Sequence, residues 1–436
     1  MKTLYYNIRK SDIGVKIAIF AYVSAQFIEV ILFNLGGIPI SVQKILAIML
    51  FPLSLLLIGC IRINWHLILF GFLISFCYSI SYILHFNGTS ELVSANIIVF
   101  MGATGAIVLY TALTESTNSI STLAHIWIGF SLITSLIVIL QAVNVVPLFK
   151  GPDIVNHLRV SNNLYRGIGF KTGPNFQALM LIIGVVFTQF FMFKFRFIVT
   201  SIIMLGVIGT FSRMGLILFF LVIILHPIVE LIECKKNIFK VLIRIFLILI
   251  FMITFVLIIY IWGPIEIKKY LIARFERILE FFKRLMLYKK IDVNGHLSSA
   301  ETRFILARTA LIAGLKNWFS GVGAFQTPST IFKLSGIRQV SHNTYLEFFL
   351  IGGIWGLLPL LLFTYIFLKF IVRRSFKAFS VQRSCVIILV LMFAATGLFL
   401  SITYNSILWL PIVLILATQK NQYKFRKHLI NNMELK

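Results

Sequence analysis

A histidine and an asparagine, His342 and Asn343, stand at the start of an apolar stretch in which Glu347 is the one charged residue before Phe363. The spacing of Thr344 and Glu347 fits a capping box at a helix start. The positive end of a helix dipole disfavours an imidazolium, so we expect His342 to be neutral. A neutral imidazole can accept a proton. The same pattern also suits an N-cap pair without chemistry, and these features alone do not separate the two readings.

Two cationic residues precede another helix start. In NNLYRGIGFKTGPNFQALML, Arg166 and Lys171 come before Pro174. Proline is favoured in the first turn of a helix, where the backbone N–H groups have no intrahelical partner. Cationic side chains beside such N–H groups form an anion-binding arrangement. The sequence therefore predicts an anion site at this helix start.

A third helix start carries an arginine between two apolar segments. In GTFSRMGLIL, Ser212 is suited to cap the helix, and Arg213 follows it directly. An arginine held at the membrane surface in this way is a functional candidate. The alternative is an anchor whose guanidinium reaches out to the lipid headgroups.

The common motifs of cofactor chemistry are missing from the sequence. It contains no P-loop, GxSxG, HExxH or dinucleotide-binding glycine pattern. The four cysteines lie in apolar segments or in a short basic loop, so neither a disulfide framework nor a thiolate metal site is indicated. The sequence thus predicts no metal and no cofactor.

The composition is that of a polytopic membrane protein. Of 436 residues, 59% are hydrophobic and 12% are charged, whereas about 25% are charged in a soluble protein. A helix needs roughly 20 apolar residues to cross the hydrocarbon core. By that length the sequence predicts an all-α fold with about 12 transmembrane helices. Their ranges are 15–35, 42–61, 65–84, 92–113, 123–146, 176–193, 197–211, 214–232, 241–262, 343–368, 384–403 and 404–418.

The basic residues of the short loops predict the orientation. Lysine and arginine favour the cytoplasmic side, and they gather at the N-terminus, at 194–196, 235–240 and 373–377, and in the C-terminal tail. The short loops around Asn87 and Tyr404 contain neither. We therefore expect both termini in the cytoplasm, with loops 147–173 and 263–341 on the other side.

The expected organisation is one membrane domain with an external helical subdomain. Residues 1–262 hold helices one to nine and the loop 147–173, residues 263–341 form a large basic loop, and residues 342–436 hold the last three helices and the tail. The formal net charge is +26, and the basic excess in loop 263–341 predicts an anionic ligand. Within that loop, residues 265–288 suit an amphipathic helix, either in the membrane interface or as a solvated cover. A capping box at Ser298 predicts a second helix, running to about Trp318.

Several of these motifs resemble the superfamily of O-antigen ligases and O-antigen polymerases. HNTYLEFFLIGGIWG is similar to the family signature of His-Asn and two spaced glycines, with the structural motif residues Asn343, Gly353 and Gly356 after His342. RGIGFKTGPNFQALML, GTFSR and RTALIAGLKNWFSGVGAF are similar to other family segments, in the same order. Family members often carry an acid before the first signature glycine, where this sequence has Ile351 and Gly352.

The resemblance implies a GT-C-like membrane fold and a glycosyltransferase that needs no metal or nucleotide sugar. Its donor would be a glycan on undecaprenyl diphosphate, used on the periplasmic face of the bacterial inner membrane. By matching positions, Arg166, Lys171, Arg213 and Arg303 would bind the diphosphate. His342 would act at the reacting end, together with Arg166 and Arg213 as catalytic residues.

The expected reaction is the polymerisation of a surface polysaccharide, O-antigen or capsule, because two basic loops suit two lipid diphosphate substrates. An O-antigen ligase, which transfers the glycan to lipid A-core, is the alternative. A flippase or secondary transporter is the third reading, although charges near mid-span are few. The expected partners are the undecaprenyl-diphosphate-linked oligosaccharide, membrane lipid, a chain-length regulator and a flippase, with no nucleic acid.

Overall fold

A computed structural model describes most of the chain. It covers residues 2–148, 158–234, 299–373 and 380–434, except residues 30, 36–37, 86–88, 117, 162–163, 172 and 193, together with isolated residues between 238 and 254. The helices are α1 (Lys2–Phe27), α2 (Val42–Ile58), α3 (Trp65–His85), α4 (Thr89–Glu115), α5 (Ser119–Ala142), α7 (Pro174–Phe191), α8 (Arg196–Gly209), α9 (Arg213–Cys234), α12 (Ser299–Lys316), α13 (Thr327–Ser335), α14 (Thr344–Gly352), α15 (Leu357–Val372), α16 (Ser380–Phe399) and α17 (Trp409–Glu434). Two antiparallel ribbons, β1 (Ile31–Leu35) with β2 (Ile38–Ser41) and β3 (Arg159–Ser161) with β4 (Leu164–Tyr165), complete the described elements.

Length and apolar composition make this an all-α polytopic membrane protein. Within the described ranges, 7 helical segments are long and apolar enough to cross a membrane, and two shorter apolar helices accompany them. The total of about twelve spans stays a prediction. Most of the span expected at 241–262 and the whole amphipathic helix expected at 265–288 lie outside the described residues.

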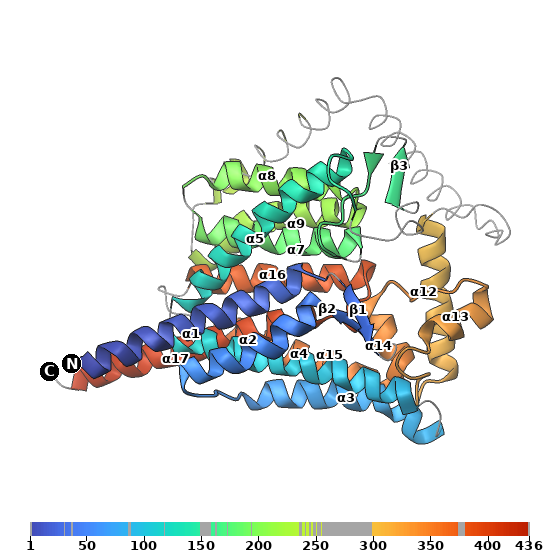
Figure 1. Ribbon diagram of the computed structural model, residues 1–436, viewed down its shortest axis with the longest axis horizontal. Coiled ribbons are helices and arrows are strands. Elements are labelled where there is room, and N and C mark those ends of the chain that lie inside the picture. The colour runs from blue at the N-terminus through green and yellow to red at the C-terminus, as the bar shows by residue number, and fades with distance from the viewer. Residues whose placement is uncertain are drawn as a thin grey trace.

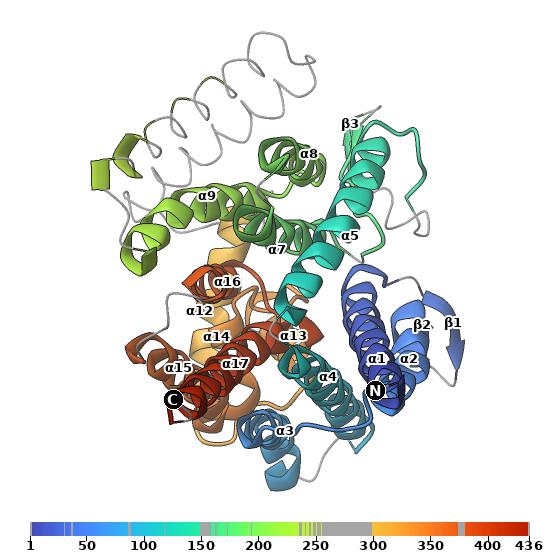
Figure 2. The same ribbon diagram turned by 90° about the vertical axis from the view of Figure 1, so that its left-hand side faces the viewer.

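The helices form a bundle with two distinct ends (Figure 1). Both chain termini lie at one end, where α1 and α17 project together, and α12, α13 and the start of α14 lie at the opposite end, which we call the loop end. The start of α9 and the end of α16 also lie at the loop end. A view from the termini shows α16 between α9 and α14 (Figure 2), and α16 contacts both helices.

The first predicted span ends earlier than expected. Instead of one helix over 15–35, α1 ends at Phe27, and Ile31–Leu35 pairs with Ile38–Ser41 as an antiparallel ribbon. The sequence NLGGIP explains the difference, because glycine favours turns and proline cannot continue a helix. The last span likewise begins at Trp409 rather than at Tyr404, after the short 3-10 helix η3 (Ser406–Leu408).

The tenth predicted span is broken near the loop end. The expected helix over 343–368 divides into α14, the 3-10 turn η1 (Gly353–Gly356) and α15. The loop after α12 causes the break, because its backbone N–H groups bond the last carbonyls of α14. Val322 donates to Leu350 O at 2.9 Å and Gly323 to Ile351 O at 2.9 Å. With these carbonyls satisfied from outside, α14 ends without a regular continuation.

Close packing at small residues holds α5, α7 and α8 together. A Cβ on Gly184 of α7 would lie 2.1 Å from Ser131 Oγ of α5, and one on Gly206 of α8 would lie 2.5 Å from Ser135 Oγ. Small residues at such crossings let helix backbones approach closely in a membrane. The indole of Trp127 adds a 3.0 Å hydrogen bond to Met180 O across the same interface. This packing fixes where the N-termini of α7 and α9 lie.

Candidate functional site

A buried glutamine on α5 anchors the loop that carries Arg166. The side-chain oxygen of Gln141 accepts the N–H groups of Ile168 at 3.1 Å and Gly169 at 2.8 Å, and its amide donates to Gly169 O at 3.2 Å. Gly169 has φ +56°, a conformation that favours glycine. These bonds give the loop one defined path at the end of α5.

The α8–α9 turn joins this loop to two helix starts. Ser212 Oγ accepts the Gly215 N–H at 3.1 Å, which confirms the predicted cap of α9, and it donates to Asn175 Oδ1 in the first turn of α7 at 2.8 Å. The Arg166 Nε donates a long hydrogen bond of 3.4 Å to Thr210 O. Arg166 is therefore held at the turn that leads into α9, whose first residue is Arg213.

This turn brings cationic side chains to the starts of two helices. The first N–H groups of α7 and α9 have no intrahelical partner, and both helices begin here with Asn175 and Arg213 in their first turns. Such a helix end favours negative charge, and arginine offers a planar fork of donors to phosphate oxygens. The arrangement is suited to bind a phosphate-like anion.

The His-Asn pair has a different local structure from the predicted capping box. Asn343 is the N-cap of α14, and its side-chain oxygen accepts the Leu346 N–H at 3.0 Å. The hydroxyl of Thr344 does not cap the helix but donates to Leu400 O at 2.6 Å. The capping box of Thr344 with Glu347 is therefore wrong, because Asn343 takes the capping role and Thr344 ties α14 to the end of α16.

Glu347 instead holds the residues that precede the helix. Its fully buried carboxylate accepts the Ser341 N–H at 3.1 Å and lies 2.7 Å from the Ser341 hydroxyl. The chain between them passes through His342 in the left-handed conformation, with φ +54°. This conformation costs a non-glycine residue on the order of 1 kcal/mol. The hydrogen bonds of Ser341 and Asn343 on either side hold this backbone conformation.

The electrostatic setting of His342 keeps its imidazole neutral. Burial and, to a lesser degree, the charge of Arg303 lower the pKa of His342 to about 4. This low pKa is in line with the expected neutral imidazole, with burial and Arg303 as its causes rather than the helix dipole. Burial also lowers the pKa of Arg303 on α12. A neutral base and a guanidinium thus share one partly buried environment.

These groups form two pairs at the loop end of the bundle. Arg166 and Arg213 lie at the α8–α9 turn, and Arg303 and His342 lie between α12 and α14. The end of α16 connects them, because α16 packs against α9 while Leu398 and Leu400 near its end accept hydrogen bonds from Asn343 and Thr344.

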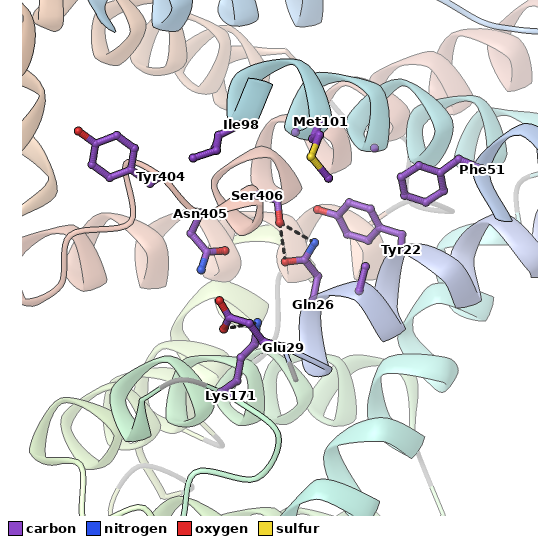
Figure 3. A pocket seen from close by; sticks show the side chains of 13 residues that line it. Tyr22, Gln26, Glu29, Phe51, Ile98, Met101, Lys171, Tyr404, Asn405 and Ser406 are labelled. Carbon is purple, nitrogen blue, oxygen red and sulfur yellow. Dashed lines mark hydrogen bonds and ion pairs between the residues drawn. The ribbon is translucent and has the colours of Figure 1, made fainter. Parts of the chain in front are cut away.

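The structure places Lys171 apart from these pairs. Its ammonium is 2% exposed and lies 3.6 Å from the Glu29 carboxylate, so its charge is balanced within the protein. Burial lowers the pKa of Lys171, and the interaction with Glu29 opposes this shift. The side chain lines a cavity between α1, α4 and the loop before α17 (Figure 3). The role expected for Lys171 at the diphosphate stays a prediction, and this pairing gives it no support.

The two signature glycines build the break between α14 and α15. Gly353 has φ +59°, and a Cβ there would lie 2.4 Å from Trp318 O. A Cβ on Gly356 would lie 1.9 Å from Phe348 O. Only glycine allows this close backbone approach. These residues therefore shape the support behind His342 and Asn343.

The sequence patterns did not predict the roles of three polar residues. These are Gln141, Glu29 and Glu347, the last of which binds Ser341 rather than forming a capping box. Each is a polar side chain inside or at the edge of an apolar segment, which is rare enough to mark a specific task. That signal was present, but their partners lie in distant segments. Among the described residues there is no group of three or more His, Cys, Asp and Glu that could hold a metal ion.

The bundle and its cationic loop end define a polytopic membrane protein with a candidate anion site. A family model described as O-antigen ligase matches residues 196–361, from the start of α8 into α15. Residues 196–361 are therefore similar to the O-antigen ligase and polymerase family, whose members are glycosyltransferase-like membrane enzymes. The matched range includes Arg213, Arg303 and His342. The comparison with curated proteins gave no match.

Proposed function

We propose that this protein is the polymerase of a bacterial surface polysaccharide. It would transfer a glycan from undecaprenyl diphosphate to a lipid-linked repeat unit on the periplasmic face of the inner membrane. One observation supports this proposal most. Arg166 and Arg213 lie where the starts of α7 and α9 are joined, and a neutral His342 lies beside Arg303 at the same end of the bundle.

The diphosphate is the part of the donor that the arginines suit. As the bond from the anomeric carbon to the phosphate oxygen breaks, negative charge gathers on the leaving diphosphate. Fixed guanidinium groups stabilise that charge more in the transition state than in the ground state, which accelerates the reaction. Arg166 and Arg213 would bind the phosphates together with the N–H groups of α7 and α9, and Arg303 would contact them from α12.

His342 is the proposed base for the acceptor. The acceptor hydroxyl oxygen forms the new bond to the anomeric carbon, its proton passes to the neutral imidazole, and the diphosphate leaves with the bonding electron pair. A pKa near 4 makes a free imidazole a weak base. Binding of an anionic diphosphate beside Arg303 would raise this pKa, because it offsets the repulsion between two cations. The base would thus gain strength when the donor is bound.

A ligase reaction uses the same groups with lipid A-core as acceptor, and the description of the matching family favours it as the second candidate. A transporter is supported less. Its usual sign is a broken helix that exposes backbone groups to an ion or substrate near mid-membrane. At the break after α14, the backbone carbonyls instead accept hydrogen bonds from the N–H groups of Val322 and Gly323.

Purified full-length protein tests the proposal, with lipid-linked repeat units from cells that lack it as the substrate. We expect a ladder of longer glycans on the lipid without added metal, nucleotide or ion gradient. Replacing the acceptor by lipid A-core tests the ligase alternative in the same assay. The His342→Ala variant, inserted normally in the membrane, should form no ladder, and a normal ladder from it would refute the proposed base.

A further inference from the structure

The cavity that contains Lys171 is distinct from the two cationic pairs. It has a volume of about 240 Å³ and lies between α1, α4, Phe51 of α2 and the loop from Tyr404 to Ser406 (Figure 3). Water occupies about 30 Å³ per molecule in the liquid, so this space holds about eight waters, roughly the volume of one sugar ring.

The cavity contains a buried hydroxyl that has no internal partner. Tyr22 is 2% exposed, and its Oη has no hydrogen-bond partner among the residues that the structure describes. Its hydroxyl points toward Gln26 and Ser406, which bond each other at 3.1 and 3.2 Å. A buried polar atom without a partner is costly. Because Tyr22 lines the cavity, its hydroxyl is the group that a ligand in the cavity would satisfy.

The remaining lining indicates an uncharged, hydroxyl-rich ligand. Glu29 and Lys171 neutralise each other at 3.6 Å, so the cavity presents no net charge. Gln26, Asn405 and Ser406 supply amide and hydroxyl groups, while Phe51 and Tyr404 supply aromatic surface. Such a mixture of hydrogen-bonding groups and aromatic surface matches the two aspects of a sugar ring, its hydroxyl edge and its C–H face.

The cavity also lies within reach of the proposed reaction centre. Arg166 and Lys171 belong to one short loop, and five residues of extended chain span at most about 18 Å. A glycan of a few sugars would cover that length. Its reducing end could thus lie by Arg166 while a more distant sugar occupies the cavity.

We propose that this cavity binds one uncharged sugar residue of a lipid-linked glycan substrate, with the Tyr22 hydroxyl as a hydrogen-bonding group. The inference rests on the proposed function for its link to the reaction, but binding itself needs no turnover. The sugar could belong to the donor or to the acceptor, which share this chemistry.

The first test is Tyr22→Phe in the full-length protein. The change removes only the hydroxyl, and the folded protein loses no hydrogen bond, so it should fold normally. In the transfer assay, donor and lipid-linked repeat are varied in turn. We expect the KM for one of them to rise about five- to tenfold, the usual effect of one lost hydrogen bond, with kcat within about twofold. The substrate whose KM rises is the one that occupies the cavity.

Tyr110→Phe is the matched control. Tyr110 on α4 is also buried, and its hydroxyl accepts a 3.3 Å hydrogen bond from Asn64 Nδ2. This hydroxyl lies near the C-terminal end of α4. The Tyr110→Phe change should leave both KM values unchanged. Unchanged values in Tyr22→Phe would overturn the proposal, and so would an equal rise in the Tyr110→Phe control.

The second test needs no activity. Saturation-transfer NMR of the wild-type protein with glucose, galactose, mannose and N-acetylglucosamine should show binding of at least one sugar, weakened by Tyr22→Phe and unaffected by Tyr110→Phe. Absence of binding by all four would overturn the cavity proposal even if polymer forms. Sugar binding without any transferase activity would instead uphold the cavity and overturn the proposed function.

Discussion

The hydroxyl of Ser212 donates a 2.8 Å hydrogen bond to the side-chain oxygen of Asn175, so the first turns of α7 and α9 are joined directly. The same hydroxyl accepts the Gly215 N–H and caps α9. The N-termini of two helices therefore meet beside Arg166 and Arg213. One small side chain thus links the helix ends that make up the candidate phosphate site.

Replacing this side chain should affect both stability and activity. We expect Ser212→Ala to lower the free energy of unfolding by about 1 kcal/mol, because the cap of α9 is lost. Transferase activity should fall further than this stability loss implies, since α7 and α9 are no longer joined. Ser121→Ala, in the first turn of α5, is the control and should retain activity. Full activity of Ser212→Ala would show that the tie is unimportant.

Arg213 should be required for its shape as well as for its charge. Arg213→Ala is expected to reduce transfer about 100-fold or more, the usual effect of removing one fixed donor to a developing negative charge. Arg213→Lys should recover only part of the activity, because an ammonium cannot engage two phosphate oxygens in parallel. Polymer length and initial rates measure both effects, with membrane insertion checked separately.

The control for this pair is Arg338→Ala, which removes an exposed arginine from the loop before His342. It should transfer at the wild-type rate. A lysine variant as active as the wild type would contradict the paired contact with phosphate.

Arg303 should set the pH dependence of His342. Because the pKa of His342 is about 4, the imidazole is neutral above that pH, and kcat/KM should fall only as the pH drops toward 4. Arg303→Gln removes one cause of the lowered pKa, so the fall should move to higher pH. It should not reach the ordinary value of about 6.5, because burial, the larger cause, remains.

Histidine NMR titration of the same variants follows this pKa without turnover. Arg308→Gln, an exposed position on the same helix, is the control and should leave the titration in place. The lowered pKa of His342 also makes the stability of the native state depend on pH. The native state loses stability as the pH falls from 6.5 toward 4, because the unfolded chain binds a proton there and the native imidazole does not. An unshifted titration in Arg303→Gln would show that Arg303 does not lower the pKa of His342.

The break after α14 should depend on Gly353. Gly353→Ala places a Cβ 2.4 Å from Trp318 O at φ +59°, so we expect a loss of about 1–3 kcal/mol in stability. Gly129→Ala is the matched control, because nothing lies within 4 Å of a Cβ there. Within a helix, that change should be neutral or slightly stabilising. Thermal denaturation in detergent compares the two variants, and equal melting temperatures would contradict the strain at Gly353.

The apolar spans could be predicted from the sequence because the membrane sets their length and composition. The break at Gly353 could not, since it depends on N–H groups of Val322 and Gly323 that reach α14 from another segment. The sequence NLGGIP contains a local sign against a long first helix, which a prediction from apolar length alone does not use.

The candidate site shows the same division between local and distant causes. The cap by Ser212 was predictable, because helix starts have local signals. The pairing of Lys171 with Glu29 joins two segments far apart in the chain, and no local pattern reveals it. The same holds for Gln141, whose buried amide anchors a loop that lies beyond the end of its own helix.

The central claim is that the two cationic pairs bind one lipid diphosphate. The most direct measurement irradiates the unaltered full-length protein with a radiolabelled, photoreactive analogue of undecaprenyl diphosphate and maps the label at positions 166, 213, 303 and 342. The account predicts labelling at all four positions, competed by unlabelled lipid, and none at control positions 338 and 423. Labelling confined to one pair, or equal labelling at the control positions, would contradict it.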